Sequence, residues 1–426
     1  MKKALMAFCD SDGAIYKHPA AIAAFRSGRR FVAVEQEELM PLPDGSTLYV
    51  LPGRFPVEGR SFKSVSNFNG NEILAVAAFL SSGYLRTYLP AYIKTPDAPL
   101  LSLWAYCGVV FVGDDFYVPA MRIDPDQRSD PALHRNDGEL FKTIKTIKKE
   151  YPGNSLVKQL ITCSTKYGCL CARNFFLSRY EAPIPTTRMC NALCLGCFSF
   201  QKDTGIHVSQ YRLTKEPSPE EIAQVMLHHI ERVDRAVVSF GQGCEGEPLM
   251  RAKDIARAIT LVRKRTNRGT IHMNTNGSKP EALTMCIDAG LDSVRVSLNS
   301  PTEEYYTRYY RPKNYYYNDV LQSIALACKA GIFVSLNLFF LPGFTDAESE
   351  VKNLFSFLDR FPVDMIQTRN LNIDPDYYLD TISFVDEPAL GIRTLLATLR
   401  ERYPDIRLGY YNPPKESFSE CESCGN

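Results

Sequence analysis

The second half of the chain alternates between short apolar runs and longer segments in which apolar residues recur every three or four positions. The short runs predict buried strands and the periodic segments predict helices. The predicted strands begin with PIPTT at Pro183 and continue at residues 236–240, 270–274, 293–298, 333–340 and 364–369. The predicted helices cover residues 219–233, 253–265, 280–289, 318–330 and 347–360. Repeated strand–helix units require a parallel sheet with right-handed crossovers, so residues 183–404 are predicted to form a partial (β/α)6 TIM-like barrel.

The flanking regions have different patterns. Residues 1–135 carry short β-like runs between turn residues, such as RRFVAVEQ and YCGVVFVGDDFYVPAM, and predict a β-rich accessory domain. Within it, the apolar stretch at 71–81 (NEILAVAAFLS) predicts a buried helix. Residues 136–182 predict a helical connector, and residues 405–426 predict a C-terminal strand and a cysteine-containing tail. The accessory domain has no DxHxxG or GxGxxG pattern, which argues against a cobalamin or dinucleotide module.

A cysteine-rich segment, RMCNALCLGCFSFQ, follows the first predicted strand of the barrel. Its cysteines, Cys190, Cys194 and Cys197, have the spacing CxxxCxxC. Three thiolates can hold three irons of a four-iron cluster, and the fourth iron is then free to bind a substrate or cofactor. The alternative is half of a structural zinc site.

Polar, glycine-containing segments follow the next predicted strands. They are EGEP at 245–248, TNGS at 275–278 and SLNS at 297–300. Because the reactive groups of an α/β barrel gather at the carboxyl ends of its strands, these segments are expected to lie beside the cysteine loop. A zinc site would not predict this order.

Together these motifs resemble the radical S-adenosylmethionine (SAM) superfamily, and the resemblance covers about residues 183–372. It implies a 4Fe-4S cluster held by Cys190, Cys194 and Cys197, with SAM bound at the open iron. A one-electron donor such as a flavodoxin or ferredoxin would drive cleavage of SAM to methionine and a 5′-deoxyadenosyl radical. The radical would then abstract hydrogen from a substrate, in an oxidoreductase or transferase reaction.

The resemblance also implies a set of SAM contacts. Glu247 would bind the amine of SAM, and Gly246 would allow close backbone approach. Glu245 stands where the family pattern has a glycine, and Gly196 stands where an aromatic residue is common, so Phe198 is the candidate adenine contact. The remaining candidates, for the ribose or carboxylate, are Asn276, Ser297, Asn299 and Arg308, with Arg311 as an alternative to Arg308.

A second cysteine group lies just upstream of the main motif. Cys163, Cys169 and Cys171 are predicted to bind an auxiliary iron–sulfur cluster or metal ion, which Cys421 and Cys424 of the tail could complete. The alternative is that these three are ordinary buried thiols. Cys244 is expected to be an isolated small hydrophobic residue near the SAM pocket.

Composition narrows the partners and the compartment. The 426 residues are 45% hydrophobic and 23% charged, with net charge +1, so no overall positive field attracts nucleic acid. The first residues, MKKALMAFCDSDG, are too short on apolar residues for a secretory signal, and no run approaches a membrane span. Thirteen cysteines then suggest a reducing compartment, so a cytoplasmic location with metal or redox roles is expected.

The substrate class is left open. Tyrosines interleaved with Arg308, Arg311 and Lys313 at residues 305–317 would suit RNA or an aromatic peptide, although such a segment more often packs a helix. An auxiliary cluster would favour modification of a peptide or protein, or oxidation of a small molecule. The alternative to an enzyme is a zinc or iron–sulfur module for assembly or electron transfer.

Overall fold

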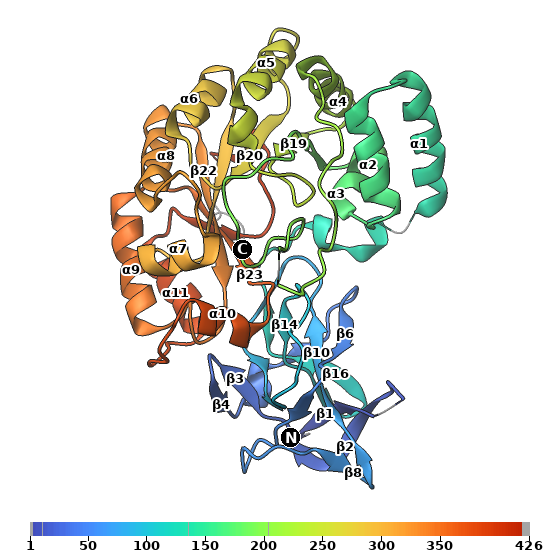
Figure 1. Cartoon of the computed structure of the whole chain (residues 1–426), viewed down its shortest axis with the longest axis vertical. Coiled ribbons are helices and arrows are strands. Elements are labelled where there is room, and N and C mark those ends of the chain that lie inside the picture. The colour runs from blue at the N-terminus through green and yellow to red at the C-terminus, as the bar shows by residue number, and fades with distance from the viewer. Residues whose placement is uncertain (1–2, 11, 135, 203, 420–426) are drawn as a thin grey trace.

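The computed structural model describes residues 3–10, 12–134, 136–202 and 204–419. Figure 1 shows a curved sheet with helices on its outer side, and a β-rich N-terminal domain below it. The predicted fold class is confirmed: an α/β partial barrel follows a β-rich N-terminal region.

The barrel sheet is parallel throughout, and its strands lie side by side in chain order from β18 to β24. The strands are β18 (Glu181–Pro183), β19 (Val237–Phe240), β20 (Thr270–Thr275), β21 (Ser293–Leu298), β22 (Phe333–Phe340), β23 (Met365–Asn370) and β24 (Arg407–Gly409). The helices are α4 (Pro219–Arg232), α5 (Ala252–Arg263), α6 (Pro280–Asp288), α7 (Glu303–Tyr310), α8 (Tyr317–Ala330), α9 (Glu348–Arg360), α10 (Pro375–Thr381) and α11 (Ile392–Arg402). The last strand, β24, is the predicted C-terminal strand.

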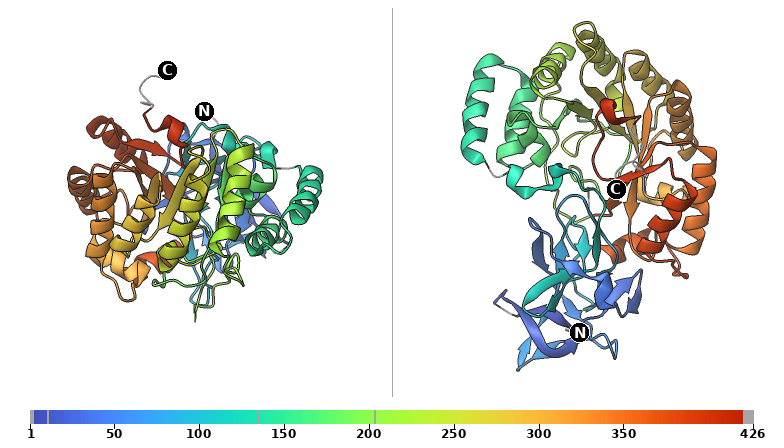
Figure 2. Two further views of the ribbon diagram at one scale, coloured as in Figure 1. Left: turned by 90° about the horizontal axis from the view of Figure 1, so that it is seen from above. Right: turned by 180° about the vertical axis from the view of Figure 1, so that it is seen from behind.

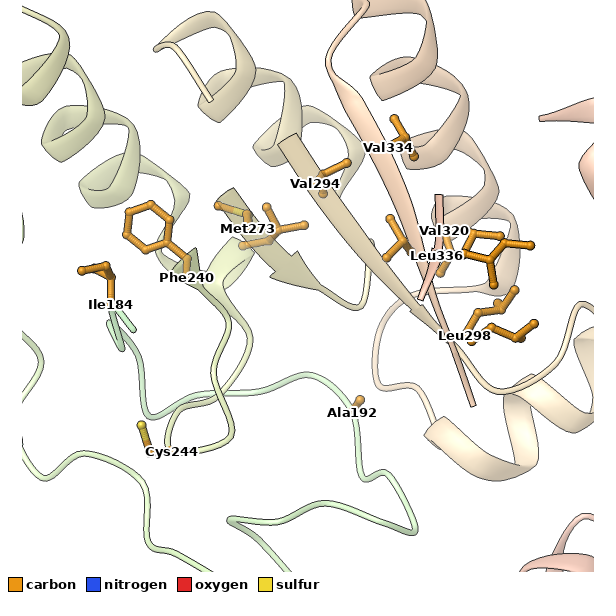
Figure 3. Close-up of a cluster of buried hydrophobic side chains, with 14 of the residues drawn as sticks. Ile184, Ala192, Phe240, Cys244, Met273, Val294, Leu298, Val320, Val334 and Leu336 are labelled. Carbon is orange, nitrogen blue, oxygen red and sulfur yellow. The ribbon is translucent and has the colours of Figure 1, made fainter. Parts of the chain in front are cut away.

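Alternation along the strands places the core between the sheet and its helices. In β21 and β22 the outward-facing residues are apolar and fully buried; Val294 and Leu336 are examples, and they lie near Val320 of α8 (Figure 3). Local signals fix the helix ends: Ser218 and Glu221 form a reciprocal capping box at the start of α4. Burial of the outward face thus holds the strands in the register that brings their carboxyl ends together.

The N-terminal domain is built mainly on an antiparallel sheet of eight strands. They are β1 (Ala4–Cys9), β2 (Ile15–Ile22), β5 (Met40–Pro41), β6 (Thr47–Val50), β10 (Leu74–Phe79), β14 (Tyr106–Cys107), β15 (Val110–Val112) and β16 (Asp115–Val118). Smaller pairings join β3 (Phe25–Ser27), β4 (Arg30–Val32), β7 (Arg54–Pro56), β8 (Asn67–Phe68), β9 (Asn71–Glu72), β11 (Tyr84–Arg86), β12 (Leu89–Pro90), β13 (Tyr92–Lys94) and β17 (Ala120–Arg122).

The helix predicted at 71–81 is wrong, because this stretch forms strands β9 and β10. Strand β10 pairs with β1, β6 and β14, and its residues 75–78 are buried on both faces. A strand covered on both faces has a continuous apolar sequence, which periodicity alone does not distinguish from a buried helix.

Three helices form the connector and pack beside α4 (Figure 1). They are α1 (Asp137–Glu150), α2 (Ser155–Thr165) and α3 (Leu170–Phe176). The second cysteine group lies here: Cys163 is on α2, Cys169 is the residue before α3, and Cys171 is in its first turn.

The N-terminal domain contacts the barrel at the carboxyl ends of β22 and β23. Gly28 donates its backbone N–H to the carbonyl of Pro342 at 2.8 Å. The Arg54 guanidinium pairs with Asp374 at 2.7 Å, and both side chains are 1% exposed. Because a buried ion pair is costly to break, this contact holds the domain next to the barrel mouth.

The segment after β24 returns across the barrel and bridges its open edge. The Asn412 side chain donates to Glu181 of β18 at 2.7 Å and accepts from Gln367 of β23 at 2.7 Å. It thus connects the first strand of the sheet with the strand next to the last. Cys421 and Cys424 lie outside the described residues. Across the described ranges, no helix is both long enough and apolar enough to cross a membrane.

Candidate functional site

The CxxxCxxC segment forms a loop after β18, and Cys190, Cys194 and Cys197 are all half-buried in it. Two backbone hydrogen bonds fix the loop on α7: Leu193 donates to the carbonyl of Tyr310 at 2.9 Å, and Leu195 donates to that of Tyr309 at 3.0 Å. The predicted cysteine loop is therefore held at the carboxyl ends of the barrel strands.

The loop after β19 is bonded directly to the cysteine loop. Gly246 donates its N–H to Thr187 at 2.7 Å, and Glu247 donates its N–H to Met189 at 2.8 Å. A Cβ atom on Gly246 would lie 1.8 Å from the Met189 oxygen, so only glycine permits this approach. These contacts bring Glu247 next to the cysteines, as the sequence predicted. Figure 3 shows Cys244 of this loop and Ala192 of the cysteine loop below the strand ends.

The Glu245 carboxylate has a different role from that of Glu247. It accepts hydrogen bonds from the backbone N–H groups of Thr186 at 2.7 Å, Gly241 at 2.5 Å and Gln242 at 3.0 Å. Its oxygens are therefore occupied in holding the two loops in shape. Glu245 fills the position of a family glycine with a structural carboxylate, and Glu247 stays the candidate SAM contact.

Glu247 is 4% exposed and joins the loop after β19 to the loop after β20. It accepts from the Thr275 hydroxyl at 2.5 Å and from the Asn276 N–H at 2.8 Å. Burial raises the pKa of Glu247 to about 6. A carboxyl group in this state gains strongly from a nearby cation, which is the role predicted for it toward the SAM amine.

Asparagine side chains tie this polar group to the cysteine loop. The Asn276 side-chain amide donates to the Asn191 side-chain oxygen at 2.9 Å, and the Asn191 side-chain amide donates to the Ser278 hydroxyl at 2.8 Å. The structure thus brings Glu247, Asn276 and the cysteine loop together, as their positions at successive strand ends predicted.

The other predicted SAM contacts are placed more loosely. Ser297 is half-buried near the end of β21, and Asn299 donates to the carbonyl of Tyr305 at 3.1 Å and the hydroxyl of Tyr378 at 3.1 Å. Arg308 donates to the carbonyl of Ile382 at 2.8 Å and pairs with Glu304. Phe198 is 38% exposed. These four contacts stay predictions.

Two residues near the cysteines have no signal in the sequence pattern. Asn191 lies between Cys190 and Cys194, and nothing in the sequence distinguishes it from an ordinary loop residue. Arg212 lies in a long loop, yet its guanidinium donates to the Ser199 hydroxyl at 3.2 Å and lies 3.8 Å from the Cys197 sulfur. Only the folded loop shows that Arg212 and Cys197 are neighbours.

The cysteine loop fits an iron–sulfur cluster in its donor chemistry. Burial raises the pKa of Cys190 to about 11 and that of Cys194 further, so both are protonated at neutral pH and would release protons on binding iron. Within the described residues, no three His, Cys, Asp or Glu side chains meet closely enough to hold a single metal ion. A cluster does not require that, because each cysteine binds a different iron.

The second cysteine group differs from the prediction in one member. The thiols of Cys163 and Cys244 lie close enough to shift each other's pKa, so Cys244 is not isolated. Cys169 donates its N–H to the Cys163 carbonyl at 2.9 Å, and the Cys171 thiol donates to the carbonyl of Glu181 at 3.6 Å. Four cysteines from α2, α3 and the loop after β19 are therefore neighbours; Cys244 was missed because 73 residues of sequence separate it from Cys171.

The tyrosine-rich segment packs inside the protein. Tyr306, Tyr309 and Tyr310 of α7 are at most 3% exposed, and Tyr306 and Tyr310 stack with ring centroids 4.4 Å apart. The helix supports the cysteine loop through the carbonyls of Tyr309 and Tyr310. These rings are therefore not free to stack on a base or a peptide, and the packing interpretation is confirmed for them.

Comparison with known proteins gives a family. Residues 184–355 match the family model described as "Radical SAM superfamily". An uncharacterized protein of Methanocaldococcus jannaschii is 24% identical over 226 residues, which is 52% of this chain and 69% of the relative.

Solved structures resemble the chain over about two thirds of its length. Streptococcus suis SuiB bound to S-adenosylmethionine has 15% identity and a TM-score of 0.40, with 68% of each chain covered. HydG, a maturase of the FeFe-hydrogenase, has 15% identity and a TM-score of 0.39; the similarity covers 65% of this chain and 66% of HydG. On the family match and the motifs at the strand ends, residues 184–355 of this chain form a domain of the radical SAM superfamily of enzymes.

Proposed function

We propose that the chain uses a 4Fe-4S cluster held by Cys190, Cys194 and Cys197 to cleave SAM reductively and abstract hydrogen from a substrate. When bound, the cluster and SAM supply the radical chemistry, and the protein supplies binding, orientation and exclusion of water. An electron donor such as a flavodoxin or ferredoxin is needed. A small molecule, a peptide and an RNA are the candidate substrate classes, and a cytoplasmic location stays a prediction.

The chain's own residues divide the work at the site. The Glu247 carboxylate would bind the amine of SAM, since it is buried and lies close enough to Cys190 to help raise the pKa of that thiol. Gly246 keeps the backbone clear, and the linked amides of Asn191 and Asn276 orient the loop. Phe198, Ser297, Asn299 and Arg308 are proposed as further SAM contacts.

One observation carries this proposal: the cysteine loop and the Glu247 loop are joined by backbone hydrogen bonds at the carboxyl ends of the strands. This is where α/β barrels hold their reactive groups. A structural zinc site has no need of a buried carboxylate and a chain of amides beside it.

The test is anaerobic reconstitution with iron and sulfide, followed by addition of SAM and a reductant. We expect a brown protein whose electron paramagnetic resonance spectrum changes on adding SAM, and which forms 5′-deoxyadenosine on reduction. A colourless protein that binds zinc and ignores SAM would instead support a non-catalytic module.

We also propose an auxiliary iron–sulfur site in the second cysteine group. The predicted ligands are Cys163, Cys169 and Cys171, and the contact with Cys163 adds Cys244 as the fourth. Four thiolates would saturate such a cluster, which suits electron transfer. Iron analysis of the Cys163 and Cys244 variants, described below, tests this site separately from SAM cleavage.

A further inference from the structure

The inner face of the barrel strands is mostly polar. Met365 and Phe339 are apolar residues in the same register, and the polar inward-facing residues are Ser239, His272, Asn274, Arg295, Ser297, Ser335, Asn337, Gln367 and Arg369. A barrel interior that serves only as a core is filled with branched apolar side chains. Burying polar groups destabilises a protein unless they are hydrogen-bonded, so this interior is suited to binding a polar molecule.

Solvent reaches this inner face toward the carboxyl ends of the strands. In β21, Arg295 and Ser297 are half-buried, whereas their neighbours Val294, Val296 and Leu298 are fully buried. The same alternation occurs in β22 at Asn337 and Phe339. Because solvent reaches only the inward-facing residues of these strand segments, the interior is accessible from the barrel mouth, where the cysteine loop lies.

Two arginines meet inside the barrel without a carboxylate between them. The Arg295 and Arg369 guanidinium groups both donate to one neutral acceptor, the Gln367 side-chain oxygen, and the Arg369 contact is 3.3 Å long. Arg369 also lies over the Tyr410 ring at 3.7 Å. In the described part of the chain, neither arginine forms an ion pair.

Polar atoms beside the two arginines lack partners. The Arg295 Nε, the Ser335 hydroxyl and the Asn337 carbonyl oxygen are buried without a hydrogen bond to any described residue. Arg295 and Ser335 are paired in register on adjacent strands. Burial, and then the charge of Arg369, lower the pKa of Arg295 to about 9, so the two positive charges are poorly compensated. Glu181, the nearest carboxylate of this network, is held by Ser239 and Asn412.

We propose that the barrel interior binds the substrate through an anionic group, a carboxylate or a phosphate, seated between Arg295 and Arg369. Guanidinium groups bind both anions through paired N–H donors. Arg295 is one inward position deeper than Ser297, and Arg369 is one inward position closer to the mouth than Gln367, so the anionic group would sit just inside the mouth. A site between the strands suits a small organic acid or phosphate ester. Only the identification of the bound anion as substrate rests on the proposed function.

The test is calorimetric titration of the reconstituted full chain at low salt with inorganic phosphate and, separately, with succinate. We expect wild type to bind at least one of the two, and the one that binds more tightly identifies the group. Arg295→Gln and Arg369→Gln should each weaken that binding about tenfold or more, the effect of losing a charged hydrogen bond. The matched control is Arg257→Gln, an exposed arginine paired with Glu220 on the outer helices, which should bind like wild type.

A second variant guards against misfolding. Gln367→Glu is isosteric and places a negative charge between the two guanidinium groups, so it should abolish anion binding while both arginines stay in place. Unchanged binding in Gln367→Glu and in both arginine variants would overturn the inference, as would equal loss in the Arg257→Gln control or no binding of either anion by wild type.

Formation of 5′-deoxyadenosine is measured on the same preparations. A protein that binds the anion in the barrel but cleaves no SAM refutes the proposed function alone. A protein that cleaves SAM but binds neither anion refutes the anion site alone.

Discussion

The two cysteine groups have different surroundings, although the loop after β19 contributes a residue to each of the two sites. Cys190, Cys194 and Cys197 lie on an irregular loop beside a buried carboxylate and a chain of amides. The second group is enclosed by α2 and α3, and its thiols contact one another and backbone carbonyls. Cys244 of the second group and Glu247 of the first site are three residues apart.

This difference indicates a division of labour. Under the proposed function, three sulfurs on the first loop would leave one iron for SAM, whereas four sulfurs in the second group would complete the coordination of an auxiliary cluster. Metal sites that do chemistry keep an open position, and closed ones serve structure or electron transfer. The short segment between Cys244 and Glu247 would then connect the two sites.

The largest expected effect is at the first group. Cys190→Ala removes a ligand of the proposed catalytic cluster and should lower 5′-deoxyadenosine formation at least about a hundredfold, beyond the loss typical of residues that only support metal ligands. Iron bound by the second group should be retained. Activity that survives in Cys190→Ala would contradict the assignment of this loop.

At the second group the expected effect is on iron and not on SAM. Cys163→Ala and Cys244→Ala should each lower the iron content of the reconstituted protein, and the spectral change on adding SAM should persist. Cys286→Ala is the control, because this thiol of α6 is buried in the hydrophobic core and donates to the Ala252 carbonyl at 3.8 Å. If Cys163→Ala and Cys244→Ala retain full iron content, the auxiliary site does not exist.

The free energy of unfolding should fall at acid pH, because a buried histidine near the second cysteine group becomes protonated on unfolding. Burial lowers the pKa of His229 to about 4, and its ring packs against Phe175 of α3. The unfolded chain takes up this proton near pH 6.5, so the stability from neutral His229 is complete above that pH and is lost as pH falls toward 4. The loss is up to about 3 kcal/mol, at about 1.4 kcal/mol for each pH unit.

Urea unfolding between pH 7 and 4 measures this effect. His229→Gln should flatten part of the pH dependence, and His272→Gln should flatten another part, because burial also lowers the pKa of His272 to about 4. A wild-type stability that does not change across this range would show that neither histidine is neutral through burial.

The smallest expected effect concerns SAM affinity. Glu247→Gln should weaken SAM binding about tenfold, because the charged hydrogen bond to the amine becomes a neutral one. Since the pKa of Glu247 is about 6, wild-type affinity should fall as pH drops through 6, while that of Glu247→Gln stays level. The control is Glu220→Gln on the exposed side of α4. Equal SAM affinity in wild type and Glu247→Gln would remove Glu247 from the proposed contacts.

The barrel and its polar strand ends could be predicted because short stretches of sequence carry the signal for each. Periodicity gave most strands and helices of the barrel, although its first strand is Glu181–Pro183 and not the predicted PIPTT at 183–187. The cysteine loop, Glu247 and Asn276 all lie in segments that follow a strand. Chain order in a parallel sheet then places them at one edge.

Contacts between distant segments could not be predicted in this way. Arg212 reaches Cys197 from a loop without regular structure, and Cys244 meets Cys163 only once α2 packs beside the barrel. Strand β10 was misassigned because both of its faces are buried in apolar clusters, with Val76 and Ala78 in one and Ala75 and Ala77 in the other. This burial is a property of the folded domain and not of the strand's own sequence.

The bridge made by Asn412 has a consequence for how the molecule comes apart. In the described sheet, the strands at the two margins are not hydrogen-bonded to each other; the Asn412 side chain joins β18 to β23, and the Lys415 N–H binds the Thr270 hydroxyl of β20 at 2.7 Å. Because a few such contacts and no strand ladder close this edge, we expect the barrel to open there at a lower cost than between two paired strands. Local opening at this edge would admit water to the inner face that carries Arg295 and Arg369 while the outer helices were still packed.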